Sequence, residues 1–243
     1  MISDQERIDK FRGVPSSTMI FDQLAESGET VILNFSRGKD SIAVWIELEK
    51  RGIPLIAIHK SPVPGLKFIE DDLKRYEDYF GHEIIDLPSD GFLRRLANKV
   101  WQTPERCAII EAAQLPELTR EEWDRLMRLK YATEDTWILD GVRATDSATR
   151  RMAMQQYGPI KERAKRMSPI WDWGIGDVRD AIAKRGITLG IEYEWFGRSI
   201  DGIGYTYADK LRQHVPDDYE RVRFWFPMID LDQLRFTEGG AEL

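Results

Sequence analysis

One stretch decides the fold of this chain: Val31-Ile32-Leu33-Asn34-Phe35 followed by Ser36-Arg37-Gly38-Lys39-Asp40-Ser41. Its first five residues are apolar and β-prone and predict a buried strand, and the apolar run after the stretch predicts a helix. A strand that ends in a glycine-bearing turn and continues as a helix presents backbone N–H groups at the positive end of the helix dipole. Gly38 lets a ligand approach the backbone closely, Lys39 adds positive charge, and the two serines add hydroxyl donors. The turn is therefore predicted to bind phosphate.

Predicted strands and helices alternate along the chain on both sides of this turn. Besides residues 31–35, apolar runs predict strands at 54–59, 83–87, 137–139 and 167–171. Amphipathic stretches between them predict flanking helices, and helical segments over 4–12 and 17–25 precede the first strand. This alternation predicts an α/β fold with a doubly wound, mostly parallel five-stranded sheet. Ligands bind such sheets at the carboxyl ends of the strands, which is where the turn would lie.

A second loop with the chemistry of an anion site follows the predicted strand 137–139. It reads Asp140-Gly141-Val142-Arg143-Ala144-Thr145-Asp146-Ser147-Ala148-Thr149-Arg150. A planar guanidinium suits phosphate and sulfate oxygens, and two of them in one loop can clamp a polyanion. The alternative is an internal Arg–Asp pair that only holds the loop together. Basic residues are in local excess over 141–170, where either an anionic ligand or a solvated helix face accounts for them.

The first turn resembles the PP-loop, Ser-x-Gly-Lys-Asp-Ser, of the ATP pyrophosphatases. It is not a Walker A loop, which has a glycine where this chain has Leu33. The second loop is similar to the Gly-x-Arg-x-x-(Asp/Glu)-Ser-x-x-Arg element of the phosphoadenylyl-sulfate (PAPS) reductases in that superfamily. Pro169-Ile170-Trp171-Asp172-Trp173 is similar to their Pro-Ile-x-Asp-Trp segment, which is expected to pack the domain. These resemblances run from about residue 30 to residue 185 in the order of the family.

The resemblance implies an adenine nucleotide alpha-hydrolase-like fold and an enzyme that cleaves ATP between the α- and β-phosphates. Such an enzyme adenylates an acceptor and yields AMP and pyrophosphate, in sulfur transfer or in nucleotide or nucleic-acid modification. The implied cofactors are ATP and Mg²⁺, with Asp40 orienting the metal. The implied catalytic residues are Lys39, Asp40, Arg143 and Arg150. The predicted nucleotide-binding residues are Ser36, Arg37, Gly38, Lys39, Asp40, Ser41, Ala57, His59, Gly141, Arg143 and Ser147, with Ala57 and His59 beside adenine.

The resemblance also divides the chain. Residues 1–190 would form the PP-loop nucleotide-binding α/β domain, with 1–28 as a helical lead-in. Residues 191–243 would form a small helical or irregular C-terminal extension. Its glycine- and aromatic-rich segment 195–207 is expected either to close over a substrate as a lid or to form a surface turn.

The chain departs from the PAPS reductases at its C-terminus. Residues 236–243 contain no cysteine, so the nucleophile that these reductases carry in this region is absent. Two alternatives stay open beside ATP cleavage: a PAPS- or adenylyl-sulfate-binding protein that uses a partner's thiol, and an ATP-binding subunit without turnover. The single cysteine, Cys107, is expected to be a small buried hydrophobe in a helix, with a sulfur-accepting role as the alternative.

Composition excludes several other classes of protein. A net charge of -7 disfavours coating of nucleic acid by the whole surface, although a nucleic-acid acceptor at a local site stays open. One cysteine and three scattered histidines give no zinc or iron–sulfur spacing. There is no signal peptide or membrane-length apolar run. We therefore expect a cytoplasmic enzyme with no membrane partner, an unspecified acceptor substrate and the option of a homo-oligomer.

Overall fold

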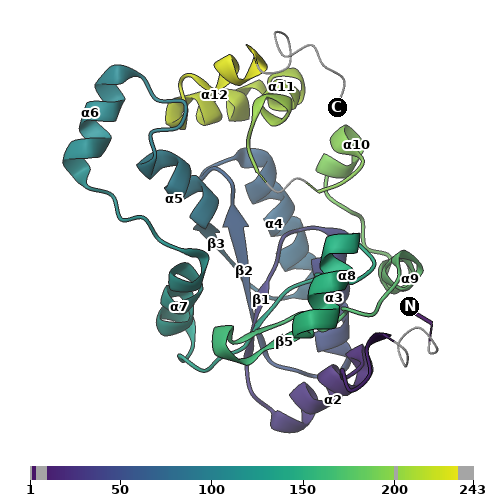
Figure 1. Cartoon of the computed structure of the whole chain (residues 1–243). Helices are drawn as coiled ribbons and strands as arrows, with labels where there is room; N and C mark the ends of the chain where they lie inside the picture. The colour runs from purple at the N-terminus through teal and green to yellow at the C-terminus, as the bar shows by residue number, and fades with distance from the viewer. Residues whose placement is uncertain (1, 4–9, 200–201, 235–243) are drawn as a thin grey trace. The chain divides into compact units, whose positions relative to one another are not determined.

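The computed structural model describes residues 2–3, 10–199 and 202–234, and it has an α/β fold (Figure 1). Its strands are β1 (Val31–Asn34), β2 (Leu55–Ser61), β3 (Ile84–Pro88), β4 (Ile138–Leu139), β5 (Ile160–Lys161) and β6 (Arg166–Met167). Their order in the sheet is β3-β2-β1-β4-β6-β5. β1 runs parallel to β2 and β4, and β4 runs parallel to β6. The expected class of fold, a mostly parallel sheet flanked by helices, is confirmed.

Helices make up most of the remaining structure. They are α2 (Ser17–Ser27), α3 (Lys39–Lys50), α4 (Lys67–Phe80), α5 (Asp90–Ala97), α6 (Pro104–Ala113), α7 (Arg120–Tyr131), α8 (Ala148–Tyr157), α9 (Ile175–Arg185), α10 (Glu192–Phe196), α11 (Tyr205–His214) and α12 (Pro216–Trp225), with 3₁₀ turns η1 (Glu162–Ala164) and η2 (Ile229–Gln233). The helix expected over 4–12 falls largely outside the described residues. None of the helices in the described ranges has the length and apolar character needed to cross a bilayer.

The sheet differs from the expected one at its β5–β6 edge. It has a sixth strand, β5, which pairs antiparallel with β6. β5 was not predicted because two residues are too few to show a period in the sequence. The strand expected over 167–171 is also shorter, since β6 ends at Met167. Pro169 has no N–H to donate to a sheet, and the N–H of Trp171 instead donates to the carbonyl of Ser168 at 3.1 Å, forming a turn.

The order of the strands reverses beside β1. The chain passes from β1 to β2 and β3 on one side, and then returns to place β4 on the other side. The loops that follow β1 and β4 therefore leave the carboxyl ends of two neighbouring parallel strands. In open α/β sheets this reversal creates a crevice where ligands bind.

The chain groups into two compact units. The first contains Met1–His59 and Asp124–Gly190, and the second contains Lys60–Trp123 and Ile191–Leu243. Both loops of interest belong to the first unit. The domain division expected from the sequence, at residue 190, stays a prediction.

The core of the first unit supports the turn after β1. α3 packs against β1 and α9, and its residues 41–48 are all buried, as their nearly continuous apolar sequence predicts (Figure 1). The ring of Trp45 meets that of Phe35 edge to face, with centroids 5.0 Å apart. Trp171 is fully buried, and its indole N–H donates to the carbonyl of Pro15 at 2.9 Å. The packing role expected for the 169–173 segment is thereby confirmed.

The second unit has its own supports. Leu66, the N-cap of α4, has no side-chain oxygen, and Asp218 replaces it by accepting hydrogen bonds from the N–H groups of Lys67 (2.6 Å) and Phe68 (2.9 Å). α11 and α12 pack on each other, and the ring of His214 stacks on Trp195 at 4.9 Å between centroids. The described part of the C-terminal extension is helical, as expected.

Candidate functional site

The turn between β1 and α3 forms the base of the candidate site. Gly38 is the N-cap of α3 and, as a glycine, has no side chain to cap the first turn of the helix. Arg37 has a φ of 60°, in the left-handed region that few residues other than glycine adopt. Its buried side chain donates from Nε to Nε2 of His59 at 3.2 Å. Arg37 therefore ties the turn to β2, and its backbone is the part that faces the site.

The two serines brace the turn from within. Ser41 is buried, and its hydroxyl donates to the carbonyl of Gly38 at 2.9 Å while accepting from the N–H of Ser36 at 3.2 Å. The hydroxyl oxygens of Ser36 and Ser41 lie 3.1 Å apart. Ser41 thus holds the shape of the turn, whereas the exposed Ser36 is the serine whose hydroxyl a ligand can reach.

The loop after β4 packs directly on the start of α3. A Cβ atom added at Gly141 would lie 2.8 Å from both the carbonyl carbon and the Cβ of Asp40, and 3.0 Å from the nitrogen of Ser41. Contacts this short require the backbone to shift. The absence of a side chain at Gly141 therefore lets the two loops, far apart in the sequence, lie against each other.

We expect Gly141→Ala to lower the free energy of unfolding by about 1–3 kcal/mol, because the added methyl group overpacks this junction. Urea unfolding followed by tryptophan fluorescence measures the change. Gly176→Ala in α9 is the matched control, since its Cβ would meet no atom within 4 Å. Equal stability of the two variants would show that the loop after β4 does not rest on α3.

Five charged side chains of alternating sign connect the two loops. Lys39 Nζ lies 2.8 Å from Asp40 Oδ2, and Arg143 Nε lies 2.9 Å from Asp40 Oδ1. Asp146 continues the series, with Oδ1 2.6 Å from Arg143 Nη2 and Oδ2 2.6 Å from Arg150 Nη1. Three cations against two carboxylates leave one positive charge beside the N-terminus of α3, which favours an anion.

The members of this charge network differ in accessibility. The Arg143 side chain is 5% exposed and is held by two carboxylates, so the internal Arg–Asp pair considered from the sequence is present. Its Nε and Asp40 Oδ1 form an ion pair without the alignment of a hydrogen bond. Arg150 is 48% exposed and Lys39 is 29% exposed, so these two cations are the ones a ligand meets first.

A buried ion cluster beneath the second loop was not predicted from the sequence. Arg166 Nη2 lies 3.0 Å from Asp140 Oδ2, and Arg166 Nη1 pairs with the buried Asp124 of α7. Ser168 Oγ donates to Asp140 Oδ1 at 2.7 Å. Burial by itself would lower the pKa of Arg166, but Asp140 and Asp124 outweigh it and raise that pKa. Asp140, directly before Gly141, is thereby fixed in place. Its position at the end of a strand was the one feature of the sequence that could have indicated this role.

Other predicted residues have more limited roles in the structure. Ala57 and His59 are buried in β2, so their placement beside adenine stays a prediction. Ser147 is the N-cap of α8 and accepts a hydrogen bond from the N–H of Arg150 at 3.1 Å, which orders the end of the loop. Cys107 lies in α6 and is only half-buried, and no residue of that helix is fully buried. The expectation of a buried cysteine is therefore wrong.

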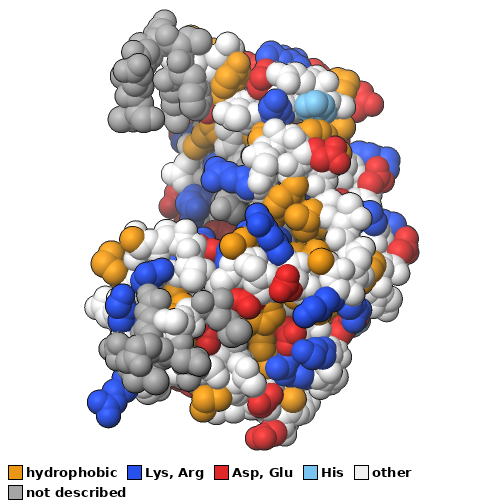
Figure 2. All heavy atoms as spheres, turned by 90° about the vertical axis from the view of Figure 1, so that its right-hand side faces the viewer, with side chains coloured by type: hydrophobic (Ala, Val, Ile, Leu, Met, Phe, Trp, Pro, Cys, Tyr) orange, Lys and Arg blue, Asp and Glu red, His pale blue; other side chains and the backbone are white. Residues whose placement is uncertain are grey.

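Surface charge is mixed on the face that Figure 2 shows. Lys and Arg side chains are interspersed there with Asp and Glu side chains.

Comparison with known proteins gives a single finding about fold. No protein-family model matches the chain, and no curated protein matches it. Among solved structures, it is similar to the NH3-dependent NAD synthetase from Campylobacter jejuni subsp. jejuni NCTC 11168 in complex with the nitrate ion. The similarity has a TM-score of 0.44 and 12% sequence identity, over 93% of this chain and 95% of that one. At these values it does not determine a family.

Proposed function

We propose that this chain binds ATP at the turn 36–41 and cleaves it between the α- and β-phosphates, as PP-loop ATP pyrophosphatases do. One observation carries the proposal: the two loops singled out by sequence meet where the strand order reverses. Arg143 Nε lies 2.9 Å from Asp40 Oδ1, and Gly141 lies against the start of α3. The parallel pairing of β1 and β4 brings both loops to the strand-order reversal, which is where ligands bind in open α/β sheets.

Each part of the site has a role in this proposal. The first N–H groups of α3 hold the β- and γ-phosphates at the positive end of the helix dipole. Lys39 moves from Asp40 to the phosphate oxygens, which carry more negative charge. Arg143, fixed by Asp146, faces the α-phosphate, and the more exposed Arg150 faces the acceptor.

The chemistry is a displacement at the α-phosphorus. A deprotonated oxygen of the acceptor, such as a carboxylate oxygen, forms a bond to that phosphorus, while the bond to the oxygen bridging the α- and β-phosphates breaks. Pyrophosphate leaves with the electron pair, and the acceptor is adenylated. Positioning of the nucleotide and the acceptor, together with electrostatic stabilisation of the transition state, accounts for the rate enhancement, so the site needs no strong general base.

Asp40 is the side chain that fits a magnesium ion in this site. Mg²⁺ is usually bound by one or two carboxylates together with phosphate oxygens and water. Asp40 would hold such an ion once Lys39 turns to the phosphates, and the ion would neutralise charge on the leaving pyrophosphate. Among the described residues, no group of three or more His, Cys, Asp or Glu side chains could hold a metal. The nucleotide therefore has to complete the coordination.

Lys39→Ala is expected to weaken binding of ATP with Mg²⁺ at least about tenfold, because a charge-assisted bond to phosphate is lost. Calorimetric titration of the full chain measures this change. Lys50→Ala is the matched control, since Lys50 ends the same helix at its far end and is 67% exposed. AMP should bind the parent far more weakly than ATP, because it lacks the two phosphates that the turn holds.

Three outcomes separate the proposal from its alternatives. Equal affinity for AMP and ATP, or an unchanged Lys39→Ala variant, would mean that the turn does not hold the terminal phosphates. Tighter binding of PAPS than of ATP would favour a sulfonucleotide ligand. Pyrophosphate release from ATP and Mg²⁺ supports cleavage, whereas tight ATP binding that gives no pyrophosphate with any acceptor class would favour a non-catalytic subunit.

A further inference from the structure

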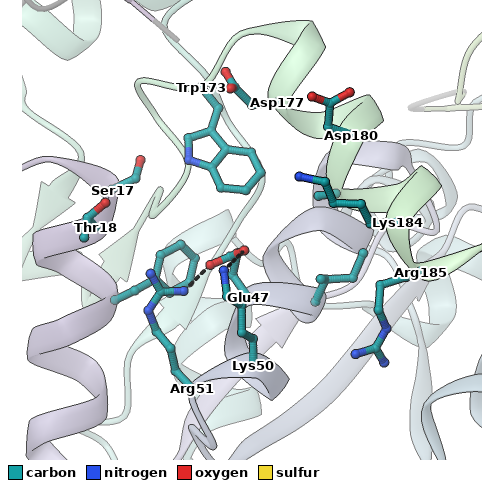
Figure 3. Close-up of a pocket in the computed structure, with 13 residues that line it drawn as sticks. Ser17, Thr18, Glu47, Lys50, Arg51, Trp173, Asp177, Asp180, Lys184 and Arg185 are labelled. Atoms are coloured by element: carbon teal, nitrogen blue, oxygen red, sulfur yellow. Dashed lines mark hydrogen bonds and ion pairs between the residues drawn. The ribbon is translucent and has the colours of Figure 1, made fainter.

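A hollow lies in the first unit, beside the opposite half of α3 from the candidate phosphate site. It has a volume of about 580 Å³ and is lined by residues of α2, α3 and α9 together with Trp173 (Figure 3). α3 contributes Ile46, Glu47 and Lys50 from its C-terminal half. Cavities of several hundred Å³ with apolar walls and a few polar groups are typical of small-molecule sites.

Trp173 presents the aromatic surface of the hollow. It is half-buried, whereas Phe21 and Ile46, which also line the hollow, are buried and expose little surface. The backbone of Trp173 is fixed, since its N–H donates to Ile170 at 3.0 Å and its carbonyl accepts from Thr145 Oγ1 at 2.8 Å. Within the described ranges its indole makes no ring contact and no hydrogen bond, so a flat ligand can stack on it.

Most of the cations around the hollow are already neutralised. Arg51 pairs with Glu47 and lies over the ring of Phe21, 4.9 Å from its centroid. Lys50 Nζ lies 3.5 Å from Glu47 Oε1, and Arg185 Nη2 lies 2.6 Å from Glu49 Oε2. Arg51 Nε also lies 3.5 Å from Asp22 Oδ1, so the three cations Lys50, Arg51 and Arg185 are matched by the three carboxylates Asp22, Glu47 and Glu49.

Lys184 is the exception. It has no ion pair and no hydrogen bond to any residue that the structure describes, and Figure 3 shows its ammonium directed toward the ring of Trp173. Two carboxylates of α9 lie nearby. Asp177 accepts a hydrogen bond from the N–H of Gly174 at 2.7 Å, which caps the helix. Figure 3 shows the carboxylate of Asp180 pointing away from the Glu47–Arg51 pair.

We propose that this hollow binds a small planar aromatic carboxylate. The ring would stack on the indole of Trp173, and the carboxylate would pair with the ammonium of Lys184. The combination favours a ligand with both features, because the indole adds nothing to the binding of a bare anion and a neutral ring forms no ion pair with Lys184. The site uses no residue of the candidate phosphate site, so it stands whether or not the chain cleaves ATP.

Calorimetric titration of the full chain with 2-naphthoate tests this proposal. We expect saturable one-to-one binding, and weakening of about fivefold in Lys184→Met from the loss of a partly exposed ion pair. Trp173→Leu should weaken binding about threefold to tenfold through loss of stacking. Asp180→Asn should strengthen it, since a nearby carboxylate repels the ligand. Arg179→Met is the matched control, because Arg179 is an exposed cation of α9 that does not line the hollow.

Two further ligands measure separately what the carboxylate and the aromatic ring contribute to binding. The neutral 2-naphthalenemethanol should bind about fivefold more weakly than 2-naphthoate, and acetate should not bind measurably. Unchanged melting temperatures would show that the variants remain folded. No saturable binding of 2-naphthoate to the parent would overturn the proposal. So would equal affinity for the neutral probe, or affinities in Lys184→Met and Trp173→Leu that match Arg179→Met.

Discussion

Arg143→Met is expected to lower the free energy of unfolding by about 2–3 kcal/mol, because it removes the buried cation that Asp40 and Asp146 share and leaves each with only a more exposed partner. The Arg143 side chain is 5% exposed and lies within 2.9 Å of Asp40 and 2.6 Å of Asp146. Methionine has a similar length but cannot donate a hydrogen bond or carry charge. The same change should weaken ATP binding at least about tenfold, since a charge-assisted contact is lost with it.

Arg150→Met provides the control for this prediction. Arg150 pairs with the same carboxylate, Asp146, but is 48% exposed, so its removal should cost less than about 1 kcal/mol. Urea unfolding of both variants, followed by tryptophan fluorescence, gives the comparison. Adding Asp146→Asn to Arg143→Met should restore part of the loss, because it removes one of the two carboxylates that have lost the Arg143 guanidinium. If Arg143→Met were as mild as Arg150→Met, Arg143 would not be a buried link between the two loops.

Arg166→Met is expected to lower the free energy of unfolding by about 3–5 kcal/mol. Arg166 lies between Asp124 and Asp140, and its removal leaves both without their common cation. Because these carboxylates raise the pKa of Arg166 above its unfolded-state value, its stabilising contribution is fully present below that value. The contribution should therefore be constant across neutral pH and be lost only in strongly alkaline solution.

Two variants make the Arg166 prediction specific. Arg163→Met removes an exposed cation from the neighbouring η1 turn and should change stability by less than about 0.5 kcal/mol. Asp124→Asn in the Arg166→Met background should recover part of the loss, because the most buried of the stranded charges is removed. A loss in Arg166→Met no larger than in Arg163→Met would contradict the buried cluster.

The main features of the fold and the outline of the site could be predicted from sequence because their signals are local. A buried strand, a glycine-bearing turn and an apolar helix follow one another within residues 31–48, and the structure reproduces that order. Gly141 and Arg143 were found for the same reason, since a strand end precedes them directly. The prediction that these residues bind a nucleotide rests on the resemblance and on their meeting in space.

Features that depend on contacts distant in sequence could not be predicted in this way. The side chain of Arg37, in the turn after β1, lies inward because His59 of β2 accepts its hydrogen bond. In the sequence, Arg166 is one of several cations in a basic stretch. Only the structure shows that it lies between two carboxylates from other elements. β5 has two residues and no period of its own. Each of these is fixed by partners that no short window of sequence contains.

The central claim is that the turn 36–41 grips the terminal phosphates of an adenine nucleotide. A crystal structure of the protein with Mg²⁺ and α,β-methylene ATP, whose α–β linkage resists cleavage, tests it most directly. We expect density for the β- and γ-phosphates against the first N–H groups of α3, with Lys39 turned from Asp40 toward them. Phosphates bound elsewhere in the molecule, with the Lys39–Asp40 pair still closed over an empty turn, would contradict it.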